Sequence, residues 1–201
     1  MRWYEVTVTG QDAHTGATPM YLRKNALLGT ARAIDAVNAV ALAHEPLAVG
    51  TVGLVEVKPN SRNVVPGEVF FTVDLRHPDD AVLDRMEAEF RAALPGIMEP
   101  LGLVFEEKRI WESPAVRFDP ELIRCVRHGA EKAGYPMREI VSGAGHDAVY
   151  IARVAPTTMI FVPCAGGLSH NEAESITIED CKAGAQVLLD AVIEYDRRFA
   201  A

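Results

Sequence analysis

The stretch AVGTVGLVEVKPNSRNVVPGEVFFTVDLRHP, residues 48–78, decides the fold. Its two outer runs, residues 48–59 and 64–78, are rich in β-branched and aromatic residues, as strands usually are. The polar segment 60–63 between them has the composition of a turn. This pattern predicts an antiparallel pair of strands.

A strand and a helix are predicted upstream of this pair. Residues 3–9, WYEVTVT, alternate apolar and polar side chains with the period of a half-buried strand. Residues 24–45 carry apolar side chains at helical spacing, and Pro46 ends that helix. Its apolar face is expected to consist of Leu27, Leu28, Ala31, Ile34, Val37, Val40 and Ala41.

A second helix and a fourth strand follow downstream. Asp79 or Asp80 can cap the helix, because a carboxylate there accepts from free backbone amides. Its apolar residues are Leu83, Met86, Phe90 and Leu94. Residues 101–111 then read as a strand. The order β-α-β-β-α-β predicts a ferredoxin-like domain over residues 1–114.

The second half, residues 115–201, is predicted to be α/β. Residues 119–136 form an amphipathic helix that ends at a glycine, and residues 177–199 form a closing helix with a capping threonine. Between them, residues 138–154 read as a short strand, a glycine turn and a helix, and residues 157–164 as a strand buried on both faces. Two such strands cannot complete a sheet, so this half is expected to be part of a larger domain.

Composition excludes several classes of protein. The 201 residues are 49% hydrophobic and 24% charged, as in soluble globular proteins. A net charge of −8 argues against a nucleic-acid binder, and no apolar run is long enough for a membrane helix. The first residues do not have a signal-peptide pattern. The separated cysteines Cys125, Cys164 and Cys181 predict reduced, mostly buried thiols in a cytoplasmic protein, and no cysteine zinc site.

Six histidines are the first candidates for chemistry, because imidazole serves both acid–base catalysis and zinc binding near neutral pH. His44, His77 and His128 have the surroundings of ordinary surface residues. His14 lies in the glycine-rich segment GQDAHTGATPM, and loops held by rigid elements often carry function. A turn histidine that bonds its own backbone is an equally good interpretation.

Two more histidines lie in the second half. His146 and Asp147 follow SGAG at a predicted strand-to-helix turn, where backbone amides can approach a ligand, although a simple glycine turn explains the pattern as well. His170, in GGLSHNEAE, is expected at the carboxyl end of a buried strand, where ligands bind in open α/β sheets. Nearby carboxylates and amides could orient its ring.

Arg76 ends a predicted strand, where its guanidinium could bind a carboxylate through two hydrogen bonds. An arginine paired with Asp74 or Glu68 is the simpler interpretation. Asn63, in the preceding turn, is a further polar candidate.

Four segments together resemble one family. GQDAHTGATPM (10–20), PNSRNVVPGEVFFTVDLRHPD (59–79), SGAGHDA (142–148) and GLSHNEAE (167–174) are similar, in the same order, to motifs of the zinc amidohydrolases of the hydantoinase/carbamoylase branch. This branch includes N-carbamoyl-L-amino-acid hydrolase, β-ureidopropionase and allantoate amidohydrolase. The similarity extends over nearly the whole chain.

The resemblance implies a dimerisation or lid domain at residues 1–114 and the C-terminal part of a zinc-exopeptidase-like catalytic α/β domain at 115–201. It implies a homodimer through the lid. His170 would bind zinc, with manganese or cobalt as alternatives. His14 would stabilise the oxyanion, in its own or in the partner subunit's site.

The remaining site residues would contact the substrate, an N-carbamoyl amino acid or a ureide. Asn63 and Arg76 would hold its carboxylate. Gly145 and His146 would contact it near the metal centre.

In this family the general base and four of the five metal-binding residues precede the lid and have no counterpart in these 201 residues. The chain alone is therefore expected to be inactive. A non-catalytic dimerisation module, or a half-enzyme completed by a separate N-terminal chain, are the alternatives.

Overall fold

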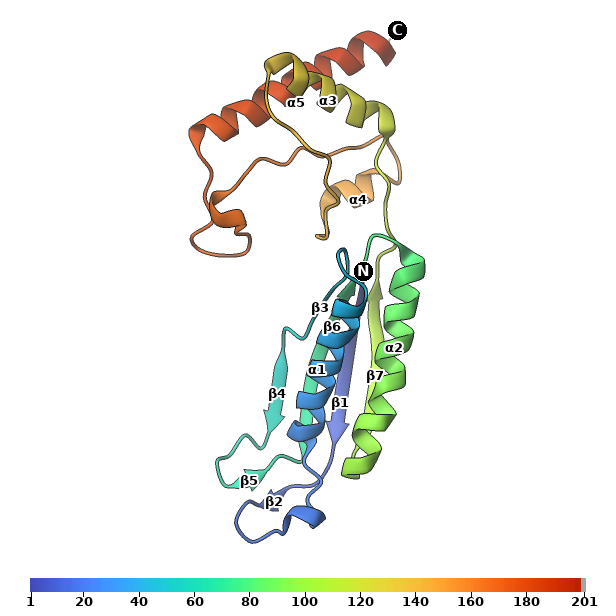
Figure 1. Ribbon diagram of the computed structural model, residues 1–201, viewed down its shortest axis with the longest axis vertical. Coiled ribbons are helices and arrows are strands. Elements are labelled where there is room, and N and C mark those ends of the chain that lie inside the picture. Colours follow the sequence, from blue (N-terminus) through green and yellow to red (C-terminus); the bar gives the residue numbers. More distant parts are fainter. Residues whose placement is uncertain (200–201) are drawn as a thin grey trace. The chain divides into compact units, whose positions relative to one another are not determined.

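The computed structural model describes residues 1–199, which fall into two compact units. The first unit is Met1–Ala115, and the second begins at Val116. The first contains an antiparallel sheet with helices, and the second contains helices joined by long loops (Figure 1). The predicted combination of helices with an antiparallel sheet is confirmed.

The sheet of the first unit contains strands β1 (Arg2–Thr9), β3 (Val49–Thr51), β4 (Val55–Lys58), β6 (Glu68–Arg76) and β7 (Val104–Glu112). Its order is β3-β6-β1-β7, with β4 also paired to β6, and every pair is antiparallel. The first of the two predicted strands in 48–78 is thus split into β3 and β4. With that split, the order is the one expected for a ferredoxin-like domain.

Two long helices, α1 (Ala26–Ala43) and α2 (Asp80–Met98), pack against each other and against the sheet (Figure 1). The alternation predicted for residues 3–9 is confirmed, because every second residue of β1 is buried, and β6 shows the same pattern. The buried strand residues are Tyr4, Val6, Val8, Val69, Phe71, Val73 and Leu75. Asp79 caps α2 by accepting a hydrogen bond from the Ala81 amide at 2.8 Å.

The buried face of α1 agrees with the predicted one at Val37, Val40 and Ala41 but differs from it in the first turns. Leu27, Leu28 and Ala31 are exposed, whereas the helix buries Ala26, Gly29, Thr30, Ala33, Val37, Val40 and Ala41. A side chain on Gly29 would place its Cβ 2.4 Å from Leu103, so small residues allow α1 to lie close to its neighbours. Of the helices within residues 1–199, α1 alone has the length and composition of a membrane span, but its contacts are those of a core helix.

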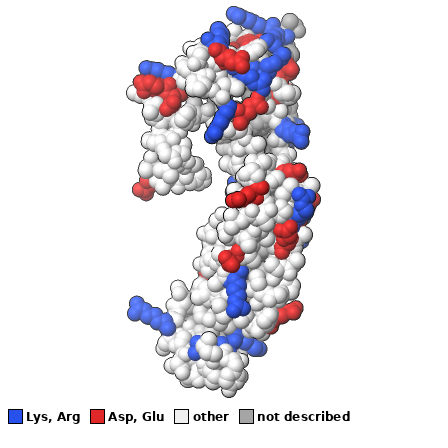
Figure 2. All heavy atoms as spheres, in the orientation of Figure 1, with Lys and Arg blue, Asp and Glu red and all other residues white. Residues whose placement is uncertain are grey.

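A two-stranded arm extends from one end of the sheet. It pairs β2 (Ala13–His14) with β5 (Val64–Val65), and the short 3-10 helix η1 (Met20–Leu22) lies beside it in the chain. In Figure 1 the arm lies at the end of the sheet opposite the N-terminus. On the face of the molecule seen in Figure 2, acidic and basic side chains are intermixed on both units.

The second unit is held by two helices, α3 (Pro120–Ala133) and α5 (Ile178–Phe199), which pack along each other (Figure 1). As predicted, α3 ends at a glycine, Gly134, whose φ of 73° favours that residue. Thr177 caps α5 by accepting from the Asp180 amide at 3.1 Å. In the sequence, a short helix, α4 (Asp147–Ile151), and the 3-10 turn η3 (Ala165–Gly167) lie between α3 and α5.

The two strands predicted in this unit are not formed. Residues 138–141 and 157–164 have no strand structure, and the apolar run 157–164 is partly or largely exposed. A strand needs a neighbour to bond its backbone amides and carbonyls, and within residues 116–199 there is no strand to supply one. The cysteines are also less buried than predicted, since only Cys125 is in a core, whereas Cys164 is half-buried and Cys181 exposed.

Candidate functional site

The backbones of His14 and Asn63 lie close together at the arm. His14 faces Val64 in the β2–β5 ladder, and the next residue, Thr15, donates its amide to the Asn63 carbonyl at 3.0 Å. The Asn63 side chain accepts from the Ser61 hydroxyl at 2.9 Å. Both candidate side chains are exposed. The pairing of two short strands therefore brings together residues 49 positions apart in the sequence.

The His14 ring bonds the backbone of its own loop. Its Nδ1 accepts from the amides of Gly16 at 3.0 Å and Ala17 at 3.1 Å. The interpretation as a turn histidine is thus confirmed for one ring nitrogen. Among residues 1–199 the other nitrogen, Nε2, has no hydrogen-bond partner and is on an exposed side chain. A ring held through Nδ1 can present Nε2 outward, so the two interpretations of His14 are compatible.

The base of the arm is closed by two glycines. Gly10 donates its amide to the Gly67 carbonyl at 2.7 Å, and Gly67 donates its amide to Asp12 Oδ1 at 2.7 Å. A Cβ on Gly10 would lie 2.1 Å from the Lys24 carbonyl oxygen, and one on Gly67 would lie 2.5 Å from Asp12. Only glycine allows the backbone segments to approach this closely.

Arg76 lies at the other end of the sheet and pairs with Asp74. Its Nη2 is 2.6 Å from Asp74 Oδ2, and its Nε also donates to the carboxylate. Both side chains are about a quarter exposed. One of the predicted partners is confirmed; the other, Glu68, pairs instead with Lys58 at 2.7 Å.

The length of β6 separates the arm from Arg76. Gly67, to which the arm is bonded, directly precedes β6, and Arg76 is its last residue. The nine residues of β6 span ~27 Å at ~3.4 Å per residue. The structure therefore brings the backbone of Asn63 close to that of His14 but not to Arg76, although the family resemblance groups Asn63 with Arg76.

In the second unit the SGAGHDA segment forms a compact turn around His146. The Ser142 hydroxyl lies 2.9 Å from His146 Nε2 and accepts from the Ala144 amide at 3.2 Å. The ring also contacts the edge of Phe161, with centroids 5.6 Å apart. Which of the Ser142 hydroxyl and His146 Nε2 donates depends on the tautomer of the ring. Gly145 precedes His146 at the start of α4 and is exposed.

His170 is exposed and has a positive φ of 55°. The predicted strand before it is not formed, so its expected place at the end of a buried strand is wrong. The nearby polar side chains do not orient its ring. Glu174 accepts from the His170 backbone amide at 3.1 Å, and Asn171 accepts from the Ala173 amide at 2.9 Å.

The residues present do not form a metal site by themselves. Among residues 1–199 no three His, Cys, Asp or Glu side chains are grouped closely enough to hold a metal ion. A catalytic zinc needs at least three protein ligands, and His170 could be only one of them.

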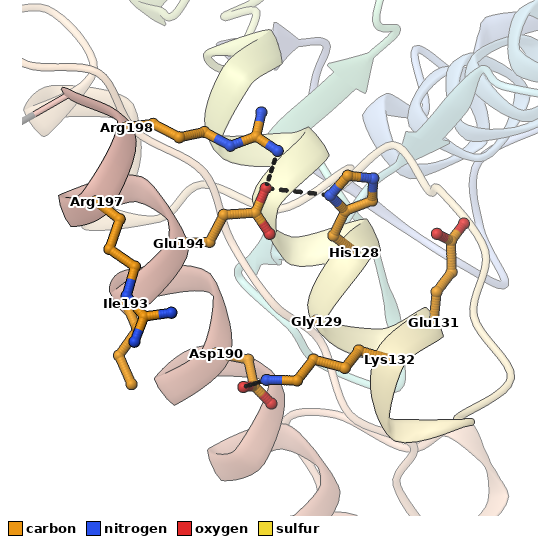
Figure 3. A pocket seen from close by; sticks show the side chains of 9 residues that line it. All are labelled: His128, Gly129, Glu131, Lys132, Asp190, Ile193, Glu194, Arg197 and Arg198. Carbon is orange, nitrogen blue, oxygen red and sulfur yellow. Dashed lines mark hydrogen bonds and ion pairs between the residues drawn. The ribbon is translucent and has the colours of Figure 1, made fainter.

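A surface pocket of about 520 Å³ lies between α3 and α5 (Figure 3), and its lining includes His128 but none of His14, Asn63, Arg76, Gly145, His146 and His170. His128 and Arg198 both bond Glu194, at 3.1 and 2.6 Å, and Lys132 bonds Asp190 at 2.6 Å. The hydrogen bond from Lys132 lowers the pKa of the Asp190 carboxyl. Because these charges neutralise one another, the lining of the pocket has no net charge that would attract a ligand of opposite charge.

Sequence reasoning missed two residues that hold the candidate histidines. Ser142 contacts His146, and Arg23 bonds two carbonyl oxygens in the loop of His14. The sequence offered one signal for them, since both residues are close to the histidines in the chain. Closeness in the chain does not show which side chains form hydrogen bonds.

Comparison with known proteins gives a consistent result. The model of peptidase family M20/M25/M40 matches residues 9–194. An N-carbamoyl-L-amino-acid amidohydrolase of Rhizobium meliloti is 54% identical over 96% of this chain and 46% of its own length. An allantoate amidohydrolase of Escherichia coli strain K12 is 35% identical over 93% of this chain and 46% of its own length.

The solved structures agree with these sequences. A hydantoinase/carbamoylase-family amidase from Burkholderia multivorans superposes with a TM-score of 0.91 and 55% identity, over 96% of this chain and 47% of that one. The chain thus spans about half the length of the curated relatives that it matches.

Proposed function

The chain belongs to peptidase family M20/M25/M40, and from this membership we propose that it is part of a metal-dependent amidohydrolase. The reaction would be hydrolysis of the carbamoyl C–N bond of an N-carbamoyl-L-amino acid or a related ureide. For the carbamoyl amino acid, one water is consumed, and the amino acid, ammonia and carbon dioxide are released. The observation that carries this proposal is the 54% identity to the Rhizobium meliloti amidohydrolase over nearly the whole chain.

Each candidate residue has a role that its chemistry permits. His14 would donate from Nε2 to the oxyanion that develops on the attacked carbonyl oxygen. Arg76 would bind the substrate carboxylate, with Asp74 orienting the guanidinium. Asn63 would contribute an amide donor to the carboxylate. Gly145 and His146 would contact the substrate from the second unit.

A homodimer is proposed because His14 and Arg76 are too far apart for one small substrate. The ~27 Å length of β6 separates the arm from Arg76 in a single chain. If both residues act on one substrate, they must come from two copies. A closed dimer with twofold symmetry would then contain two equivalent sites. We assign the dimer contact to residues 1–114, as a lid domain, and residues 115–201 to the catalytic domain.

The cofactor proposed for the complete enzyme is a pair of divalent ions, zinc first, with manganese or cobalt as alternatives. His170 would supply one ligand, and the others would come from outside these 201 residues. A cytoplasmic location is proposed as well, supported by three cysteines that remain free thiols.

A chimera tests the activity. This chain replaces the matching part of the Rhizobium meliloti enzyme, and ammonia release is measured with N-carbamoyl-L-amino acids and with allantoate. We expect turnover by the chimera and none by residues 1–201 alone. A folded, dimeric chimera that hydrolyses neither substrate class would contradict the proposal and favour a non-catalytic dimerisation module.

A preference for allantoate would assign the substrate to the ureide side of the proposed class. Turnover by residues 1–201 mixed with a separate N-terminal half would indicate a two-chain enzyme.

A further inference from the structure

The loop that carries His14 is tied together by Arg23. The Arg23 side chain donates from Nε to the Thr18 carbonyl at 3.0 Å and from Nη2 to the Thr15 carbonyl. The loop also closes on itself, since Thr18 donates its amide to the His14 carbonyl at 3.1 Å. One guanidinium thus fixes two backbone carbonyls on either side of Gly16 and Ala17.

Gly16 and Ala17 determine which nitrogen of the neutral His14 ring carries the proton. Their amides both point at Nδ1, at 3.0 and 3.1 Å. A ring nitrogen that accepts hydrogen bonds cannot also carry a proton, so the neutral ring must be protonated at Nε2. Gly16 lies against the ring, because a Cβ there would be 3.4 Å from Cε1. The loop therefore fixes both the orientation and the tautomer of His14.

The tautomer matters for the proposed chemistry. An oxyanion needs an N–H donor, and a neutral histidine protonated at Nε2 offers one without taking up a proton. The opposite tautomer would present a lone pair at Nε2 and repel the oxyanion. The orientation of the two amides thus decides whether His14 can act as the donor.

We infer that Arg23 is a positioning residue for His14, because it holds the Thr15–Thr18 loop in the conformation that keeps the ring in the Nε2–H tautomer. The catalytic consequence rests on the proposed function, whereas the tautomer itself does not. Arg23 needs no contact with the substrate for this role.

Nuclear magnetic resonance tests the tautomer directly. The ¹⁵N-labelled 201-residue chain is measured at an alkaline pH, where histidine rings are generally neutral. The His14 ring signals are identified by their loss in His14→Gln. We expect a protonated-type shift at Nε2 and an acceptor-type shift at Nδ1. A majority of the Nδ1–H form in the unmodified chain would overturn the inference.

Variants of Arg23 test its role. Arg23→Met removes both donors, so we expect a mixture of tautomers. Arg23→Lys, which keeps the charge and can reach one carbonyl, should be intermediate. Arg32→Met, at an exposed arginine of α1, is the matched control and should leave the His14 signals unchanged. If Arg23→Met folds and keeps the unmodified tautomer pattern, the role is refuted; if it fails to fold, Arg23→Lys decides.

Activity adds a second readout in the chimera. Arg23→Met should lower kcat by ~10- to ~10²-fold with little change in KM, as expected for a misplaced group. Combined with His14→Gln, it should cause no further loss. An inactive chimera with the Nε2–H tautomer intact would refute the proposed function alone. An active chimera whose His14 carries its proton at Nδ1 would refute the positioning role alone.

Discussion

Trp3 and Trp111 face each other across the β1–β7 pair, with their ring centroids 4.8 Å apart and their planes tilted by 44°. They are the two tryptophans of the chain, and both lie in the first unit. Tryptophan fluorescence therefore reports unfolding of this unit separately from the second. Stability changes in the first unit can be measured by urea unfolding without assuming that the whole chain is two-state.

Arg2→Met should destabilise the first unit by about 3 kcal/mol. Arg2 is buried and bonds the nearly buried Glu87 at 2.5 Å, so its removal leaves a buried carboxylate with less compensation. The loss is at the low end for a broken buried pair because Glu87 keeps Arg91 and Arg109, at 3.0 and 3.2 Å. The measurement is urea unfolding by tryptophan fluorescence.

The matched control for that variant is Lys58→Met. Lys58 pairs with Glu68 at a similar distance, 2.7 Å, but the pair is exposed and solvent screens it. No measurable change in the unfolding free energy is expected. Equal losses in the two variants would refute burial as the cause.

Tyr4→Phe should remove part of the loss of stability at alkaline pH. Burial, and then the charge of Glu87, raise the pKa of the Tyr4 hydroxyl above its usual value of 10.0. The folded state then keeps its proton where the unfolded state loses it. This contribution to stability is complete below pH ~10 and is lost as pH rises above that value.

The comparison is made at several pH values between 8 and 11, with the unfolding free energies of both proteins measured by urea. We expect the wild-type value to fall more steeply above pH ~10 than the Tyr4→Phe value. At neutral pH the variant should be within ~1 kcal/mol of wild type or more stable, since the buried hydroxyl has no hydrogen-bond partner among residues 1–199. Parallel pH curves would contradict the explanation.

Gly10→Ala should destabilise the first unit by ~1–3 kcal/mol and loosen the arm, because the added Cβ meets the Lys24 carbonyl oxygen at 2.1 Å. Urea unfolding measures the loss, and amide exchange of Thr15, which donates to the Asn63 carbonyl across the arm, measures the loosening. Gly53→Ala is the control, since nothing lies within 4 Å of its Cβ. A Gly10→Ala variant as stable as this control would show that the backbone moves at no cost.

Mixed dimers test whether His14 and Arg76 act from different copies. Chimeras carrying His14→Gln or Arg76→Met should each be nearly inactive. When they are refolded together, about half of the dimers are mixed, and each mixed dimer has one complete site, so about a quarter of the wild-type activity should return. Both residues acting within one copy would give no recovery.

The local sequence was sufficient for the long elements of the first unit, β1, α1, β6, α2 and β7, but not for the β2–β5 arm or for the split between β3 and β4. The alternation of Tyr4, Val6 and Val8 predicted which face of β1 is buried, and Asp79 marked the start of α2, because both depend on neighbours a few residues away. For α1 the spacing of apolar residues predicted that the large residues Leu27 and Leu28 are buried, whereas the structure buries small residues there. How closely two elements approach is set by the partner surface, which a single segment does not encode.

In the second unit, apolar composition predicted strands at 138–141 and 157–164 that do not form, because a strand is defined by pairing with another segment. The candidate site also depends partly on the local sequence and partly on the tertiary structure. The sequence by itself determined the residue types in the four motifs and thereby the family resemblance. Only the tertiary structure decided that the backbone of Asn63 lies beside that of His14 and that the length of β6 separates both from Arg76. Distances between remote residues follow from strand pairing and strand length, so they appear only when the chain is folded.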